Sequence, residues 1–458
     1  MVDTATFRKH KIELTEYDYT NDLQNRVKMS QFSIEDLDVL EEILYSSLRI
    51  PLSILEKNLE IPEKRLLSIL EKLSDTGLFS IQSEHVIVDK EVRKYYEFQV
   101  LKFEDDFKAG MDYLQGLLRK VPIHVLPTWY SIPRSSNNIF ESIVEKYLST
   151  PQVFQRYLLE LNLSDPAQKG IMNEVYQSPD FEVSAKDMME KFSLSQDEFE
   201  THMIELEFRL VCCVKFVREK GKFKEVITPF HEWRDYLRHV RDAHPAPIYD
   251  EEAIERDKET DYAFVEELGA LLHAAETGDA SPQAVAAECS DFYEEDFDYL
   301  IEKVTALELA EGKGRKLSVT EAGKMWLALS PSDKAIYLYR HPQNSLKGEN
   351  VPEHLCQERM IREAEKCLSS VINSGWVFLE DFLNGIFIPL SEEQLISLKR
   401  QGRTWKYVLP KYTESERNFF RALISDWLYE AGMTALGTKD DRICFRLTPF
   451  GKELFDYE

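Results

Sequence analysis

Long apolar runs, cysteine pairs and catalytic signatures are all missing from this chain of 458 residues. No stretch approaches the ~18 to 20 apolar residues that a membrane-spanning helix needs. The opening "MVDTATFRKHKIEL" is charged and lacks the apolar core of a signal peptide, so we expect neither a signal peptide nor a membrane segment. Six cysteines in a chain this long do not make a disulfide framework, and none of them forms a C-x-x-C pair that would indicate a metal site. We therefore expect a cytoplasmic protein with reduced thiols.

Enzyme signatures are absent as well. The sequence contains no Walker loop, dinucleotide-binding fingerprint or serine nucleophile elbow. The nearby histidines His231, His239 and His244 do not have the spacing of a zinc site. We predict that the protein is not an enzyme and binds no cofactor or metal. An active site assembled across domains is the alternative that the sequence leaves open.

Basic residues are scarce relative to acidic ones, with 56 Lys and Arg against 82 Asp and Glu and a net charge of −26. Residues 241–310 hold much of this excess, because 20 Asp or Glu face 4 Lys or Arg there, for a net charge of −16. A protein that binds nucleic acid over its whole surface needs the opposite sign, so any such contact must use a local basic patch. The acidic block instead favours a protein partner with a basic surface.

What the sequence does contain is a repeated corner. The stretches "KGKFKEVITPFHEW", "GRKLSVTEAGKMW" and "DRICFRLTPFGKELF" each run through a charged turn and an apolar strand to a Thr. A Thr side chain can accept a hydrogen bond from an amide in the first turn of a helix. We therefore predict that Thr228, Thr320 and Thr448 each cap a helix directly after a strand.

Helical patterns precede each corner. In the first third of the chain, "SIEDLDVLEEILYSS", "LSILEKNLE" and "PEKRLLSILEKLSDTG" place apolar residues at helical spacing, and "LFSIQSEHVIVD" has the pattern of two short strands around a turn. Three helices followed by a hairpin is the order of a winged helix, a variant of the helix-turn-helix. Four modules share this order, although a chance succession of helices and hairpins is the alternative. We predict a mostly α, α+β fold of tandem winged-helix domains with a helical insert.

Composition and turn residues place the boundaries of these modules. The predicted order is an N-terminal polar segment (1–30), winged helix 1 (31–100), a helical bracing insert (101–165), winged helix 2 (166–240), an acidic linker (241–260), an acidic winged helix 3 (261–338), a loop (339–358) and an irregular C-terminal winged-helix-like domain (359–458).

The corners "LSVTEAGKMW" and "FRLTPFGKELF" resemble the final strand and trailing helix of winged-helix domains. Their layout is similar to the winged modules found in tandem in helicase-associated and chromosome-associated proteins. The resemblance implies a fold and leaves the function open, because winged helices serve DNA binding and protein binding alike.

A winged helix that reads DNA presents basic residues on its third helix. The third helices predicted over 195–210 and 291–305 have net charges of −4 and −5, so they would repel phosphates. In the first module, Lys64, Arg65 and Lys72 are balanced by acids. The stretch "SLKRQGRTWKYVLPKY" combines basic and aromatic residues that could pair with phosphates and stack on bases. The candidate nucleic-acid contacts there are Lys399, Arg400, Arg403, Trp405, Lys406 and Lys411.

The sequence favours a non-enzymatic adaptor that docks protein partners of a nucleic-acid machine, in transcription, repair or chromosome maintenance. Its predicted partner-binding face consists of Asp291, Glu294, Glu295, Asp298 and Glu302. The alternative is a DNA-binding transcriptional regulator that uses winged helix 1 and the C-terminal basic stretch, with weak nucleic-acid contact. The identity of the partner and the oligomeric state stay open.

Overall fold

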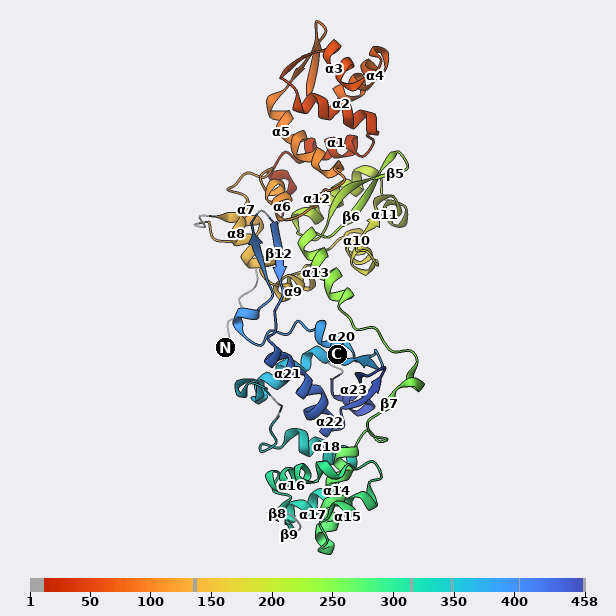
Figure 1. Ribbon diagram of the computed structural model, residues 1–458. Helices are drawn as coiled ribbons and strands as arrows, with labels where there is room; N and C mark the ends of the chain where they lie inside the picture. The colour runs from red at the N-terminus through yellow and green to blue at the C-terminus, as the bar shows by residue number, and fades with distance from the viewer. Residues whose placement is uncertain are drawn as a thin grey trace. The chain divides into compact units, whose positions relative to one another are not determined.

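The computed structural model describes residues 12–134, 138–313, 316–346, 348, 350–402 and 404–455. Helices make up 56% of the chain and strands 14%, in small antiparallel sheets, so the predicted mostly α, α+β class is confirmed. Two compact units divide the chain (Figure 1). Unit 1 comprises Met1–Arg238 and Ser397–Val408, and unit 2 comprises His239–Ile396 and Leu409–Glu458. Within the described ranges, no helix combines the length and apolar character that a membrane crossing requires.

Module 1 is the first module of unit 1. Its elements follow the order helix, strand, helix, helix, hairpin, helix. Ser33 starts it with a capping box, since its hydroxyl accepts from the amide of Asp36 and the Asp36 carboxylate accepts from the amide of Ser33. The sheet order is β1-β3-β2. The elements are α2 (Ile34–Tyr45), β1 (Arg49–Pro51), α3 (Leu52–Leu59), α4 (Glu63–Ser74), β2 (Phe79–Gln82), β3 (His85–Val88) and α5 (Lys90–Gln99).

Module 2 has the same order of elements and the equivalent sheet order, β4-β6-β5. Its elements are α10 (Pro166–Gln177), β4 (Val183–Ser184), α11 (Ala185–Phe192), α12 (Gln196–Phe208), β5 (Cys213–Glu219), β6 (Lys222–Thr228) and α13 (His231–Asp242). Modules 1 and 2 share one apolar core, in which the rings of Phe103 and Phe216 stack 4.0 Å apart.

Unit 2 holds modules 3 and 4. Module 3 comprises α14 (Ala263–Thr277), α15 (Pro282–Glu288), η5 (Glu294–Asp296), α16 (Phe297–Ala306), β8 (Ala310–Lys313), β9 (Lys316–Val319), α17 (Glu321–Leu327) and α18 (Pro331–Arg340). Module 4 comprises α19 (Glu358–Glu365), η7 (Lys366–Ser370), β10 (Val377–Phe378), α20 (Leu379–Asn384), α21 (Glu414–Ala422), the π-helical η9 (Leu423–Trp427), α22 (Leu428–Glu430), β13 (Thr434–Lys439), β14 (Arg442–Leu447) and α23 (Pro449–Phe455).

Further elements surround the modules. The predicted polar N-terminal segment contains α1, and the predicted acidic linker contains β7, which adds a strand to β13 of module 4. In unit 1 the elements are η1 (Leu14–Glu16), α1 (Tyr19–Met29), η2 (Val100–Phe103), α6 (Met111–Leu118), α7 (Leu126–Trp129), α8 (Ile139–Ile143), the π-helical η3 (Val144–Leu148), α9 (Pro151–Glu160), β11 (Ser397–Gln401) and β12 (Thr404–Val408). In unit 2 they are η4 (Glu251–Ala253), β7 (Glu255–Arg256), η6 (Glu353–Cys356) and η8 (Glu392–Gln394).

Two of the three predicted Thr caps are confirmed. The Thr320 hydroxyl accepts from the amide of Gly323 at the start of α17, and the Thr448 hydroxyl accepts from the amide of Gly451 at the start of α23, both at 3.0 Å. A Cβ added to either glycine would lie 2.1 Å from a main-chain carbonyl oxygen. These oxygens belong to Leu309 and Met433, which directly precede the first strand of each hairpin, and the close approach of each helix to them requires glycine at this position.

The prediction for Thr228 is wrong. Thr228 is the last residue of β6, and α13 begins at His231. The Thr228 hydroxyl is buried and has no hydrogen-bond partner within the described ranges. The start of the helix is tied to a distant segment, because the His231 amide donates to the carbonyl of Ala109 at 2.9 Å. In module 1 the equivalent corner ends on Asp89, whose carboxylate caps α5.

Candidate partner-binding surfaces

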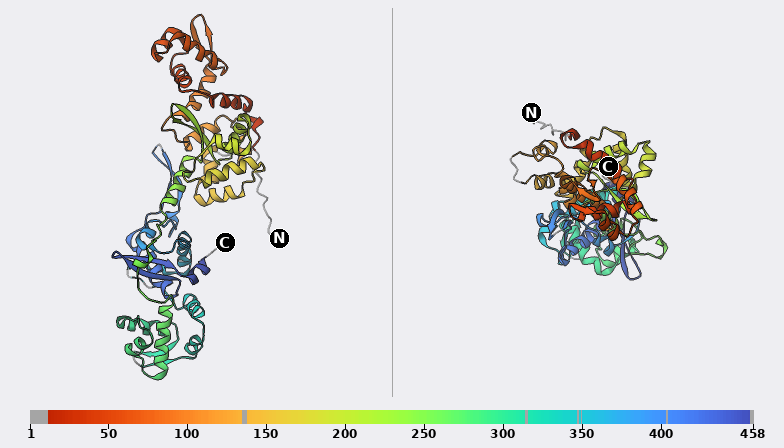
Figure 2. Two further views of the ribbon diagram at one scale, coloured as in Figure 1. Left: turned by 90° about the vertical axis from the view of Figure 1, so that its right-hand side faces the viewer. Right: turned by 90° about the horizontal axis from the view of Figure 1, so that it is seen from above.

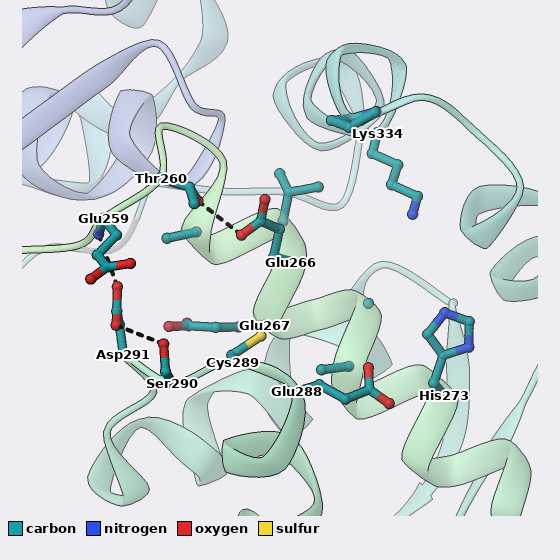
Figure 3. A pocket seen from close by; sticks show the side chains of 15 residues that line it. Glu259, Thr260, Glu266, Glu267, His273, Glu288, Cys289, Ser290, Asp291 and Lys334 are labelled. Atoms are coloured by element: carbon teal, nitrogen blue, oxygen red, sulfur yellow. Dashed lines mark hydrogen bonds between the residues drawn. The ribbon is translucent and has the colours of Figure 1, made fainter.

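A groove of about 400 Å³ runs beside α14 in module 3 (Figure 3). Three small residues of the helix, Ala263, Gly269 and Ala270, line it. A Cβ built on Gly269 meets no atom within 4 Å, so this position opens onto free space. Glycine inside a helix is less favourable than alanine by about 1 kcal/mol. Local helix stability therefore does not account for Gly269.

Acidic side chains dominate the lining of the groove. Glu259, Glu266 and Glu288 are exposed, and Asp291 is half-buried. Figure 3 shows Asp291 beside Ser290 and the main chain of Glu259, and Glu266 beside Thr260, which donates to it at 2.8 Å. The cationic Lys334 and the titratable His273 lie on the other side of the view. The groove is therefore negative at neutral pH.

One further carboxylate, Glu267, lines the groove but is already neutralised. Its side chain is buried, and Lys258, itself 7% exposed, donates to it at 2.7 Å. Burial raises the pKa of Glu267, against the pull of the Lys258 charge. The hydrogen bond from the Glu259 amide holds the pKa of Asp291 below its ordinary value, so Asp291 stays ionised. The attraction for a cation comes mainly from the exposed carboxylates and Asp291.

The predicted acidic face lies next to this groove. Glu294, Glu295, Asp298 and Glu302 are exposed on η5 and α16, and Asp291 belongs to the groove itself. Sequence reasoning missed Glu259, Glu266 and Glu288, because they come from three different elements that only the fold brings together. The one available signal in the sequence was the presence of small residues, Ala263, Gly269 and Ala270, on α14.

The third helix of module 2, α12, is covered by α1. Its acids Glu200 and Glu207 are 2% and 0% exposed, and Arg26 of α1 donates to Glu207 at 2.6 Å. The Tyr19 hydroxyl of α1 lies 2.8 Å from that of Thr201. The net charge of −4 counted from the sequence therefore overstates the negative charge on the surface of this helix. Because α1 covers it, α12 is nevertheless not free to enter a DNA groove.

The basic residues of α4 in module 1 are largely engaged. Arg65 pairs with Glu35 at 2.6 Å, and Lys72 pairs with Asp36 at 2.5 Å, so α2 supplies an acid to each. Lys64 is exposed and has no ion-pair partner in the part of the chain that the structure describes. Of the three predicted contacts in this helix, only Lys64 keeps an uncompensated charge.

The predicted basic stretch forms the hairpin β11–β12, which packs within unit 1 (Figures 1 and 2). Tyr407 is buried and its hydroxyl donates to the carbonyl of Leu148 at 3.0 Å. The amide of Leu398 donates to the carbonyl of Ser149 at 2.8 Å, and Trp405 contacts Phe140 edge to face at 6.3 Å. These contacts hold the hairpin firmly on the η3 region.

The hairpin register separates its cations. Lys399 lies directly opposite Lys406, and Arg400 lies opposite Trp405, so the lysine pair and the Arg–Trp pair occupy opposite faces of the hairpin. Lys399, Arg400 and Lys406 are exposed, and none has an ion-pair partner among the described residues. Lys411 belongs to unit 2, whereas the hairpin belongs to unit 1. Arg403, also a predicted contact, lies outside the described residues.

Comparison of the chain with protein-family models, curated proteins and solved structures finds no significant match. Across the described residues, no group of three or more His, Cys, Asp or Glu side chains is arranged to hold a metal ion. The six cysteines are unpaired thiols.

Proposed function

We propose that the chain is a non-enzymatic adaptor of tandem winged-helix modules, which docks a protein partner of a nucleic-acid machine through the acidic surface of module 3. The observation that carries the proposal is the groove along α14. It combines free space beside Gly269 with the exposed carboxylates of Glu259, Glu266 and Glu288.

The repeated sheet order supports the winged-helix assignment. Modules 1, 2 and 4 place the last strand between the short first strand and the other strand of the hairpin, as β1-β3-β2, β4-β6-β5 and β10-β14-β13. Module 3 keeps the helices and the hairpin without the short strand among its described residues. The same strand order in three modules is stronger support for a winged-helix fold than a mere succession of helices and hairpins.

The third helices support protein docking over DNA reading. The α12 helix lies under α1, and α16 directs Lys303 and Tyr299 to Glu430 of module 4, with the lysine at 2.5 Å. In module 4, Arg417 and Arg421 of α21 both pair with Glu380 at 2.9 Å. Helices occupied in this way offer few free cations to a phosphate backbone.

The groove suits a lysine or arginine side chain from a partner. Such a side chain has a long apolar stem that can lie along Ala263 and Ala270, while its charged end reaches the exposed carboxylates. The acidic face on α16 adds long-range attraction, which raises the association rate with a basic protein and makes it sensitive to salt.

Affinity capture with the full chain tests this proposal. Each protein captured from the native cell would be purified. Its binding to the wild-type chain and to three variants would then be measured at low and at physiological salt, after a check that the variants are folded. The variants are Glu266→Lys with Glu288→Lys in the groove, Glu294→Lys with Glu295→Lys and Asp298→Lys on the face, and the exposed control Glu160→Lys with Glu190→Lys.

We expect a directly binding partner whose affinity falls with salt, is lost in the groove variant, is reduced in the face variant and survives in the control. If every purified partner binds all four proteins equally, the acidic surface serves solubility alone and the adaptor proposal is wrong.

A second candidate function, nucleic-acid contact by the hairpin, is favoured by one observation. Lysines directly opposite one another destabilise a hairpin, and no acid relieves the Lys399–Lys406 pair within the described part of the chain. An anionic partner would relieve it. Because Lys399 and Lys406 are the two described cations on this face, contact with about two phosphates would give a log–log salt slope near −2 on duplex DNA.

Fluorescence anisotropy with a labelled duplex measures this slope. We expect weak, sequence-tolerant binding that is abolished by Lys399→Glu with Lys406→Glu and kept by Lys64→Glu. Loss of binding in Lys64→Glu alone would move the contact to α4 and refute the hairpin as the site.

A further inference from the structure

A small cavity lies in unit 1 where α1, η2, α12 and the β5–β6 hairpin meet. Its volume is about 10 Å³, enough for one water molecule at most. Eight residues line it: Arg26, Met29, Gln99, Lys102, Glu200, Val214, Phe216 and Glu225. Arg26, Lys102 and Glu200 are buried there, so their charges interact mainly with one another.

Three cations and two carboxylates form ion pairs around the cavity. The Glu207 carboxylate forms ion pairs with Arg26 at 2.6 Å and with Lys102 at 3.1 Å. Lys120 forms an ion pair with Asp22 at 2.8 Å. Burial opposes the ionisation of Glu207, but the charges of Arg26 and Lys102 outweigh it and lower its pKa to about 2. Lys120 and Arg26 likewise hold the pKa of Asp22 below its ordinary value, against burial. These five groups leave one positive charge uncompensated.

Two further carboxyl groups, Glu200 of α12 and Glu225 of β6, meet at the same cavity. The side-chain amide of Gln196 lies 3.4 Å from an oxygen of each, so the two carboxyl groups share one donor. Glu200 lies 4.0 Å from Arg26, and one oxygen of Glu225 is buried without a partner in the described ranges. Burial raises the pKa of both groups. The charge of Glu200 raises the pKa of Glu225 further, whereas the charges of Arg26 and Lys102 partly offset the effect of burial on Glu200. If Glu200 and Glu225 were both ionised, these two and the five groups above would together carry one net negative charge. One proton held by the pair makes the whole cluster neutral.

Other titratable groups near the cluster do not change this balance. They are Tyr17 before α1, Tyr95 of α5, Tyr113 of α6 and Cys213 of β5, and burial raises the pKa of each, so they stay neutral. Lys120 is the exception, because burial lowers its pKa to about 8 despite the attraction of Asp22.

We propose that Glu200 and Glu225 share a single proton, and that this proton keeps α1 closed over α12, the third helix of module 2. The cluster joins α1 to module 2 as a latch that alkaline pH opens. The inference is independent of the adaptor proposal, because it concerns unit 1 and the groove lies in unit 2.

A double-mutant cycle on the full chain tests the shared proton. Each of Glu200→Gln and Glu225→Gln leaves one ionised carboxylate, so we expect hydrogen exchange of the α1 amides at pH 7 to stay near the wild-type rate. The combined variant leaves a buried positive charge uncompensated, and we expect its α1 amides to exchange about tenfold faster or more. Asp197→Asn, an exposed acid on α12, is the control and should match wild type.

Two results of the cycle overturn the proposal. If both single variants slow exchange strongly, both carboxylates are ionised in the wild type; if the combined variant equals wild type, both are protonated. A pH series covers the case in which the combined variant does not fold. After correction for intrinsic exchange, α1 opening should rise more steeply between pH 7 and pH 9 in wild type than in Glu225→Gln, which keeps only the titration of Lys120. Equal slopes would contradict the latch.

Discussion

The buried carboxyl group of Glu232 should make the free energy of unfolding depend on pH, and this dependence can be measured directly. Glu232 lies in the first turn of α13 and is 6% exposed. One carboxyl oxygen accepts from the amide of Met111 at 2.9 Å, at the start of α6, and the other is buried without a partner in the described part of the chain. Burial raises the pKa of Glu232 to about 7, and the hydrogen bond from Met111 only partly offsets this effect.

The sign and size of the effect follow from this pKa. The proton stabilises the folded state fully below the ordinary pKa of 4.5, and this contribution is lost as the pH rises toward 7. The difference between the two values corresponds to about 3 kcal/mol. Glu232→Gln keeps a carbonyl oxygen for the Met111 amide and removes the ionisation. We therefore expect the variant to be more stable than wild type by up to about 3 kcal/mol at pH 8, and by less than about 1 kcal/mol at pH 5.

Urea denaturation of both proteins at pH 5 and pH 8 measures the difference. Asp242→Asn, an exposed acid at the end of the same helix, is the control and should show little change at either pH. A Glu232→Gln variant that is no more stable than wild type at pH 8, or whose gain is the same at both pH values, would refute the reasoning.

Three further predictions concern the corners and the groove, each measured by the same denaturation experiment at constant pH. Thr448→Val removes a cap and should cost about 1 to 2 kcal/mol, whereas Thr228→Val should be neutral or stabilising because the hydroxyl it removes has no partner within the described ranges. Gly451→Ala should destabilise the protein, because its Cβ would lie 2.1 Å from a backbone oxygen. Gly269→Ala should stabilise it by about 0.5 to 1 kcal/mol, and a stabilised variant that also loses its partner would show that the glycine serves binding.

The sequence predicted which helices and strands the modules contain better than it predicted the residue at which each helix after a corner begins. The pattern of an apolar strand, a Thr and an apolar helix located the corners at Thr320 and Thr448, where the cap is a local interaction between residues three positions apart. It failed at Thr228, where the helix start depends on a contact with Ala109, more than a hundred residues away. Local signals therefore sufficed wherever the capping geometry was itself local.

The candidate site was predictable only in part, for a related reason. The acids of η5 and α16 are contiguous in the sequence, and the structure leaves four of the five predicted residues exposed. Glu200 and Glu207 had the same appearance in the sequence, yet both are buried against Arg26 and its neighbours. A count of charges along a helix does not tell which face another helix will cover, because the covering helix, α1, lies far away in the chain.

The same covering decides how the net charge of the protein is distributed. Glu207 of α12 pairs with the buried Arg26 and Lys102, and Glu35 and Asp36 of α2 neutralise Arg65 and Lys72 of α4. In module 3, by contrast, few cations are available, so the carboxylates of the groove and of α16 stay exposed. The acids that pair with Arg26, Arg65 and Lys72 thus help to hold unit 1 together, whereas the carboxylates of the groove and of α16 lie on the surface of module 3. A basic partner should therefore be attracted to the groove and the α16 face of module 3 more than to α12, whose Glu200 and Glu207 are buried.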